Sequence, residues 1–223
     1  MSTSPAPNRP KPAATRSPNR RLPIIVIIAA AVVGAAVFAV ATGGKKSTAG
    51  EVNPVTVIGT PLPALPKDTT AADPAADPAV GLRPPELSGK RFNGDALTIA
   101  PGGRAKLVLF IAHWCPHCQR EVPRIVTWIS SGQKPASLDV LAVSTDVDPA
   151  GGNYPPSKWL ARENFTVDTM TDDANRSALK AWGQGGFPFV VLVKADGTVA
   201  ARTSGEMEIA DLDAWVRKGL GIT

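Results

Sequence analysis

Cysteine and histidine are scarce in this chain of 223 residues, which has two of each. All four lie in the segment 113–118, whose sequence is HWCPHC. A structural zinc site takes four ligands at the corners of a tetrahedron, and neighbouring positions on one short segment cannot readily supply them. We therefore expect no bound metal, although a zinc site is the alternative that these residue types leave open.

Acidic residues are absent from residues 1–50, which carry seven Lys or Arg. The remaining 17 basic and 19 acidic residues give the rest of the chain a formal charge of −2, although the whole sequence has +5. With this small negative net charge, electrostatics gives no reason to expect nucleic-acid binding. Residues 1–21 combine basic charge with many Pro, Ser, Thr and Asn, so we expect a disordered, cytoplasmic basic tail.

Charged side chains are also absent from residues 22–41, which are mostly apolar. A helix of about 20 residues matches the roughly 30 Å hydrocarbon core of a bilayer, so this segment predicts a transmembrane signal anchor. The excess of Lys and Arg before it places the N-terminus in the cytoplasm and the rest outside the cell membrane. Ala39-Val40-Ala41 resembles a signal-peptide cleavage site, so secretion after cleavage near Ala41 is the alternative.

Residues 42–85 are rich in Ala, Pro, Thr and Gly and contain the near-repeat ADPAADPA at 72–79. Frequent proline favours a semi-extended spacer without a packed core. We therefore expect a linker over 42–85 and a folded domain over 86–223.

Apolar runs and helical periodicity alternate along residues 86–223. The apolar runs predict strands buried on both faces at 107–112, 140–143 and 190–193, with further strands around 97–99 and 198–201. The periodic segments predict helices that begin after Cys115 and over 157–163, 174–182 and 209–218. Alternating strands and helices predict an α/β domain with a central mixed sheet flanked by helices.

The spacing of the two cysteines favours redox chemistry over two other kinds of site. A structural disulfide between Cys115 and Cys118 closes so short a loop that it would stabilise the domain by only about 2 kcal/mol, although it stays an alternative. Haem attachment requires a histidine directly after the second cysteine, where this chain has Gln119.

The residues around the cysteines suit a redox-active pair. A helix that starts after a buried strand puts Cys115 at its N-terminus and Pro116 at its first position, where a missing N–H is harmless. The unpaired N–H groups there favour a thiolate, and His117 adds a donor or a positive charge. We expect Cys115 to be the exposed nucleophile and Cys118, on the apolar stripe of the helix, to be the resolving thiol.

A strand, Trp114-Cys115-x-x-Cys118 and then a helix containing Pro123 resemble the thioredoxin superfamily, and Glu121-Val122-Pro123 is similar to its TlpA and ResA branch of membrane-tethered bacterial proteins. The resemblance covers roughly residues 84–220. It implies a thioredoxin-like fold and a thiol-disulfide oxidoreductase whose redox group is the Cys115–Cys118 disulfide, with no other cofactor. It also implies a cis bond between Phe187 and Pro188, which with Trp114 would line the substrate groove.

Two positions depart from the family pattern. Leu109 stands where thioredoxins often bury an aspartate that helps to deprotonate the second cysteine, so Glu121 or water must serve as the proton relay. Phe187 is bulkier than the usual residue before the cis-proline, which implies a narrower or differently selective groove.

The direction of electron flow stays open in the sequence. Pro116-His117 is the dipeptide of DsbA, a strong oxidant, and favours oxidation of exported cysteine-containing proteins. TlpA-like and ResA-like proteins commonly reduce specific disulfides, including those of apocytochromes c, with electrons from an integral-membrane redox partner. A non-catalytic chaperone or metal-delivery module is the third alternative. In each case we expect a monomer of the cell envelope.

Overall fold

The computed structural model describes residues 1, 50–67 and 76–223. The described residues from Gly50 onward belong to one compact unit. The tail and transmembrane helix predicted over 1–21 and 22–41 lie outside the described residues, apart from Met1. Among those that are described, no helix is long and apolar enough to cross a bilayer.

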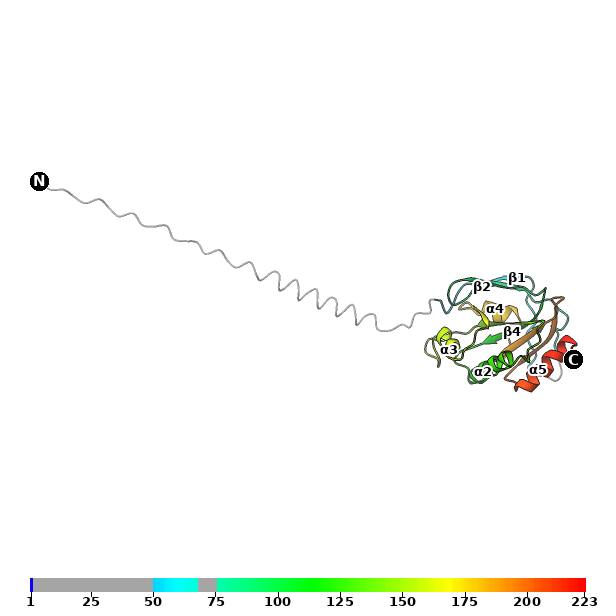
Figure 1. Cartoon of the computed structure of the whole chain (residues 1–223). Helices are drawn as coiled ribbons and strands as arrows, with labels where there is room; N and C mark the ends of the chain where they lie inside the picture. The colour runs from blue at the N-terminus through cyan, green and yellow to red at the C-terminus, as the bar shows by residue number, and fades with distance from the viewer. Residues whose placement is uncertain (2–49, 68–75) are drawn as a thin grey trace. The chain divides into compact units, whose positions relative to one another are not determined.

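One mixed sheet organises the folded unit (Figure 1). Its strands are β1 (Thr56–Ile58), β2 (Glu86–Lys90), β3 (Ala96–Ile99), β4 (Ala105–Ile111), β5 (Leu138–Ser144), β6 (Asp168–Thr171), β7 (Phe189–Val193) and β8 (Val199–Ser204). The order across the sheet is β1-β2-β6-β5-β4-β7-β8, and β3 pairs with β2. β4 is parallel to β5 and antiparallel to β7, so the most apolar strands lie at the centre. The predicted α/β fold is confirmed.

Helices cover both faces of this sheet. They are α2 (Pro116–Ser130), α3 (Pro156–Arg162), α4 (Ser177–Ala181) and α5 (Ile209–Leu220). Side chains of β4 alternate between the faces: Leu107 and Leu109 pack in the cluster with α2, α3 and α5, whereas Val108 and Phe110 pack with α4. β4 is therefore buried along its whole length, and its C-terminal end delivers the chain to Cys115 and α2.

The prediction of a linker over residues 42–85 is wrong, because much of this segment belongs to the folded unit. β1 pairs antiparallel with β2, and Leu62 and Ala79 are buried in the core on the α4 face. Asp77, within the Ala/Pro near-repeat, forms a fully buried ion pair with Arg202 of β8 at 2.5 Å. The segment was mistaken for a spacer because its proline-rich composition hides these few buried anchors.

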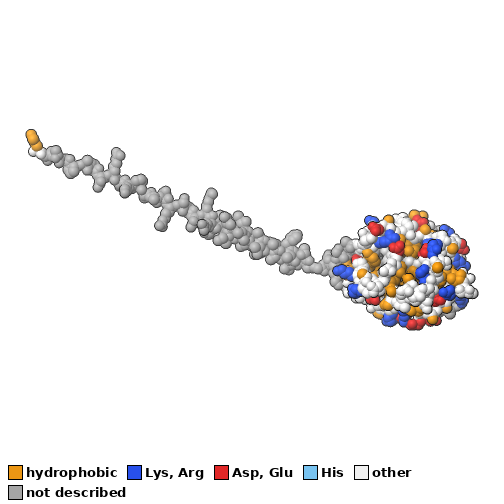
Figure 2. Space-filling view, in the orientation of Figure 1, with side chains coloured by type: hydrophobic (Ala, Val, Ile, Leu, Met, Phe, Trp, Pro, Cys, Tyr) orange, Lys and Arg blue, Asp and Glu red, His pale blue; other side chains and the backbone are white. Residues whose placement is uncertain are grey.

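On the face shown in Figure 2, basic and acidic side chains of the folded unit are interspersed. This distribution agrees with the small charge of −2 that the sequence gives beyond residue 50. A single-sign surface of the kind that attracts nucleic acid is not seen on this face.

Candidate active site

Cys115 lies where β4 gives way to α2. It is the N-cap residue with an extended backbone (φ −76°, ψ 121°), and Pro116 is the first helical residue, as predicted. Cys115 is not exposed as the sequence led us to expect: only 6% of the residue is accessible to solvent, because Phe187 packs close to it. Its Sγ lies 3.8 Å from the carbonyl oxygen of Phe187. Cys115 nevertheless remains the more accessible thiol, since Cys118 is fully buried.

Cys118 lies in the first turn of α2, on the buried stripe that the sequence predicts. Its Sγ accepts a hydrogen bond from the backbone N–H of Ala112 at 3.5 Å. Burial raises the pKa of the Cys118 thiol far above its usual value, and the nearby charge of Cys115 adds to this effect. Both cysteines are free thiols. The buried thiol therefore needs a proton acceptor before it can act as a nucleophile.

Glu121 is the acid closest in sequence to the cysteines, three residues after Cys118 on α2. Residues at this spacing are neighbours on a helix surface, about 5–6 Å apart at Cβ. The carboxylate is buried: Oε2 accepts the N–H of Met207 at 3.0 Å, whereas Oε1 has no hydrogen-bond partner among the residues that the structure describes. Burial raises the pKa of Glu121 to about 7, although the Met207 N–H and Arg124 oppose that rise. Leu109 is buried in the same cluster as both cysteines and offers no acid there.

The residues predicted to form the substrate groove lie together. The Phe187-Pro188 peptide bond is cis, as expected. The rings of Trp114 and Phe187 meet edge to face, with centroids 5.9 Å apart. Trp114 Nε1 donates to the carbonyl of Asp146 at 2.7 Å, which fixes the indole beside Cys115.

His113 holds the neighbouring backbone in place and is not part of the reactive surface. It is buried, with Nδ1 2.6 Å from the carbonyl oxygen of Gly152 and Nε2 accepting the N–H of Asp148 at 3.1 Å. These contacts require a proton on Nδ1 and tie the 146–152 loop to the end of β4. Across the described part of the chain, no group of three or more His, Cys, Asp or Glu residues could hold a metal ion.

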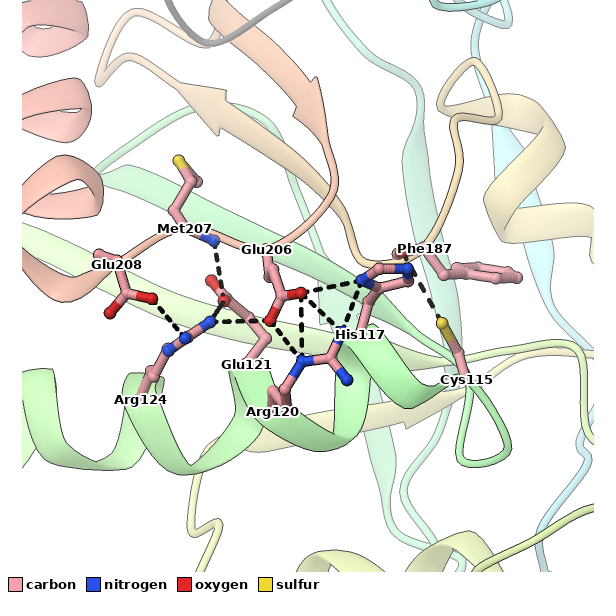
Figure 3. A network of polar contacts seen from close by, with 9 residues as sticks. All are labelled: Cys115, His117, Arg120, Glu121, Arg124, Phe187, Glu206, Met207 and Glu208. Atoms are coloured by element: carbon pink, nitrogen blue, oxygen red, sulfur yellow. Dashed lines mark hydrogen bonds and ion pairs between the residues drawn. The ribbon is translucent and has the colours of Figure 1, made fainter.

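His117 belongs to a charged network that the sequence did not reveal (Figure 3). Its Nδ1 lies 2.9 Å from Oε1 of Glu206, in the turn before α5. Arg120 donates to the same carboxylate at 2.7 Å and Arg124 donates at 2.9 Å. The hydrogen bonds from Arg120 and then His117 hold the pKa of Glu206 far below its usual range. The sequence alone gives no signal for Glu206, because it lies 89 residues from His117 along the chain.

A thioredoxin-like fold that presents a dithiol at the start of a helix, beside a cis-proline, defines the class of thiol-disulfide oxidoreductases. The family model for Redoxin matches residues 79–216, and the chain belongs to this family. The curated proteins compared with the sequence include no significant match.

Two solved structures show the likeness of fold. A thiol:disulfide interchange protein of the thioredoxin family from Chlorobium tepidum TLS is 22% identical, with a TM-score of 0.52, over 66% of this chain and 100% of its own. A secreted Mycobacterium tuberculosis disulfide oxidoreductase, described as homologous to E. coli DsbE, is 16% identical, with a TM-score of 0.50, over 59% of this chain and 94% of its own. The predicted class of enzyme is thus confirmed, whereas the direction of electron flow stays a prediction.

Proposed function

We propose that the protein oxidises cysteine pairs of exported proteins through a Cys115–Cys118 disulfide. The observation that carries this proposal is the position of Cys115 at the N-cap of α2, followed by Pro116 and the Glu206-bound His117. Helix N–H groups stabilise a thiolate at that position, which stabilises the reduced protein. A more stable reduced state makes the disulfide form a stronger oxidant.

The exchange has two steps. A substrate thiolate attacks Sγ of Cys115, which forms a mixed disulfide and breaks the bond to Cys118. The leaving Cys118 thiolate is buried and takes up a proton, and Glu121, whose pKa burial raises to about 7, is the donor in this proposal. A second substrate thiolate then attacks the substrate sulfur and expels the Cys115 thiolate. The substrate loses two electrons and the protein gains them.

Reduction of disulfides is the second candidate, and Glu121 favours it. In that direction Cys118 must lose its proton before it attacks the mixed disulfide, and a carboxylate with a pKa of about 7 is matched to accept that proton near neutral pH. Oxidised protein would then require electrons from another protein, and an integral-membrane redox partner is part of this candidate.

The setting is also part of the proposal. Residues 22–41 would anchor a monomer in the cell membrane with residues 42–223 outside the cytoplasm. Trp114, Phe187 and Pro188 would line the groove for exported cysteine-containing proteins, and the Cys115–Cys118 disulfide would be the only redox group. The support for this setting is the charge-free apolar segment and the basic residues that precede it.

The test is to incubate oxidised full-length protein with a reduced, unfolded protein that has two cysteines and to follow disulfide formation. The oxidant proposal predicts stoichiometric oxidation that is lost in Cys115→Ser. Reduction of insulin by the dithiol form, without oxidation of the unfolded substrate, would support the reductase instead. Binding without exchange in either assay would refute both.

A further inference from the structure

The side chains of His117, Arg120 and Arg124 form one row on α2 (Figure 3). Their spacing of three and four residues places them on the same face of the helix. Glu206, which precedes α5, lies against this row, and both of its carboxylate oxygens contact it. The row begins two residues after Cys115, so the network starts at the same end of the helix as the reactive thiol.

The two arginines fix the Glu206 carboxylate in place. Arg120 binds it with two nitrogens: Nη2 donates to Oε1 at 2.7 Å and Nε donates to Oε2 at 2.9 Å. Nη1 of Arg124 donates to Oε2 at 2.9 Å. Bidentate contacts of this kind add geometric specificity to an ion pair. Because the pKa of Glu206 is held far below its usual range, chiefly by the hydrogen bond from Arg120, this side chain stays ionised near neutral pH.

Nδ1 of His117 has two neighbours that make opposite demands on it. It lies 2.9 Å from Oε1 of Glu206, which can only accept a hydrogen bond, and 2.9 Å from Nη2 of Arg120, which can only donate one. A ring nitrogen has either a proton or a lone pair, so only one of these contacts is a hydrogen bond at a time. A ring with a lone pair on Nδ1 accepts from Arg120, and a ring that has gained a proton there donates to Glu206.

The charge of Cys115 acts on this network. The hydrogen bond to Glu206 raises the pKa of Arg120 above its usual value, and the charges of Glu206 and Cys115 add to that rise, although burial opposes it. Attraction between opposite charges is mutual, so a cation in the network stabilises a Cys115 thiolate. His117 is three residues nearer to Cys115 along α2 than Arg120 is, so a positive charge gained by its ring should strengthen this stabilisation.

From this geometry we infer that Glu206 is a positioning residue of the exchange reaction, which together with Arg120 holds the His117 ring before and after that ring gains a proton on reduction of Cys115. While the disulfide is present, Cys115 has no charge and His117 accepts from Arg120. Once the disulfide is reduced, His117 is a cation that donates to Glu206 and stabilises the Cys115 thiolate. The inference rests on the proposed oxidant function and adds to it the group that supports the reduced state.

Protons and electrons balance in this step. A substrate with two thiols loses two electrons and two protons when its disulfide forms. The two electrons break the bond between Cys115 and Cys118. One proton ends on the buried Cys118 thiol and the other on Nδ1 of His117, so Cys115 remains a thiolate. The side chain of His117 is 56% exposed, which lets the second proton arrive through water.

Two other acids face the same network. Glu208 contacts Arg124 and is 70% exposed, whereas the buried Glu121 has Oε2 3.8 Å from Nη1 of Arg124. In the described part of the chain neither acid is hydrogen-bonded to His117. Burial raises the pKa of Glu121 to about 7, so this acid also exchanges protons near neutral pH. A count of protons for the whole protein would combine both groups, and the test must therefore observe His117 itself.

The test is a nitrogen NMR spectrum of the full-length protein, isotopically labelled in histidine and recorded near neutral pH in the oxidised and reduced forms. The chain has two histidines, and His113 is the internal reference because Gly152 and Asp148 occupy its two ring nitrogens. We expect His117 to be a neutral ring with a lone pair on Nδ1 in the oxidised form and a cation in the reduced form, with His113 unchanged. The same protonation state of His117 in both forms would overturn the inference.

Glu206→Gln tests the positioning role. Glutamine keeps an oxygen that can accept from Arg120 but offers His117 no negative charge. The ring should then stay neutral in the reduced form, and iodoacetamide should alkylate Cys115 about two- to fivefold more slowly, the range of an exposed ion pair. The rate is measured below the midpoint of the thiolate titration, where it follows the thiolate fraction.

Two comparisons separate this role from a general effect on charge or fold. Glu208→Gln removes the neighbouring acid and should keep the wild-type alkylation rate and the cationic His117. In a His117→Ser background, Glu206→Gln should no longer slow alkylation, because the ring that it positions is gone. An equal decrease in both backgrounds would show that Glu206 acts only on the fold, and would overturn the inference.

Dithiothreitol separates failure of the inference from failure of the proposed function. If the wild-type disulfide exchanges with dithiothreitol while His117 keeps one protonation state, the inference alone is refuted. If the disulfide does not exchange with dithiothreitol, the exchange chemistry and the inference are refuted together.

Discussion

Replacing Glu121 by Gln should make the folding stability of the reduced protein less sensitive to pH. Glutamine keeps the shape of the side chain and its oxygen can still accept the Met207 N–H. It removes the charge that burial opposes, since the side chain of Glu121 is only 1% exposed. In the wild-type protein this burial raises the pKa from 4.5 to about 7.

The raised pKa determines the sign of the effect. Between pH 4.5 and 7 the folded protein retains the Glu121 proton while the unfolded chain has released it, so stability falls as pH rises through this window and levels off above it. At about 1.4 kcal/mol per pKa unit, the loss amounts to about 3 kcal/mol. The glutamine variant lacks this loss. Its amide group, left without an acceptor beside the core, imposes a cost of about 1–3 kcal/mol that does not depend on pH.

Urea denaturation of both proteins from about pH 4.5 to 8 in the presence of reductant measures the effect. The free energy of unfolding of the variant, relative to wild type, should rise by about 3 kcal/mol across that range. Glu208→Gln removes an acid that contacts the same Arg124 but is 70% exposed, and controls for the loss of charge alone. Parallel pH profiles for wild type and Glu121→Gln would refute the assignment of a raised pKa to this carboxyl.

Three further predictions concern the thiols and the buried ion pair. Cys118→Ala should trap mixed disulfides between Cys115 and its substrates, seen as adducts on non-reducing gels, and their absence in cells would contradict exchange at Cys115. His117→Ser should make the protein a weaker oxidant, and an unchanged redox potential and thiolate titration would remove His117 from the mechanism. Asp77→Ala leaves the fully buried Arg202 without its ion-pair partner, so the free energy of unfolding measured by urea denaturation should fall by about 3–5 kcal/mol. Much of this loss should be recovered in the double variant Asp77→Ala/Arg202→Met. A loss below about 1 kcal/mol would show that the pair is not buried in solution.

The central strands and the dithiol were predictable because their signals are local. The apolar run at 107–112 is long enough to identify a strand buried on both faces, and the spacing of Val122 and Ile125 identifies the helix that follows. The position of Cys115 at the helix start follows from these two neighbours and from Pro116.

The strands β1, β2 and β6, which lie together on one side of the sheet, were not predictable, because they are short and lack long apolar runs. β2 and β6 have no continuous apolar run, and Gly89 of β2 reads as a turn residue. The structure gives the reason for this glycine: a Cβ there would lie 2.9 Å from Sδ of Met170 on β6.

Long-range contacts account for the rest of what the sequence concealed. The helix predicted over 174–182 begins only at Ser177, because Arg176 adopts a left-handed backbone (φ 59°). Likewise, neither the partnership of Asp77 with Arg202 nor that of His117 with Glu206 has a local signature, since 125 and 89 residues separate the partners. Side chains brought together only by the tertiary fold leave no periodic pattern in one sequence.

The redox potential of the Cys115–Cys118 pair tests the proposed oxidant role most directly. The full-length protein is equilibrated with glutathione buffers of known ratio, and its free thiols are trapped and counted. A potential near or above about −150 mV, in the direction of DsbA, is the predicted result. A potential below about −220 mV would contradict the oxidant role and favour a reductase supplied with electrons by another protein.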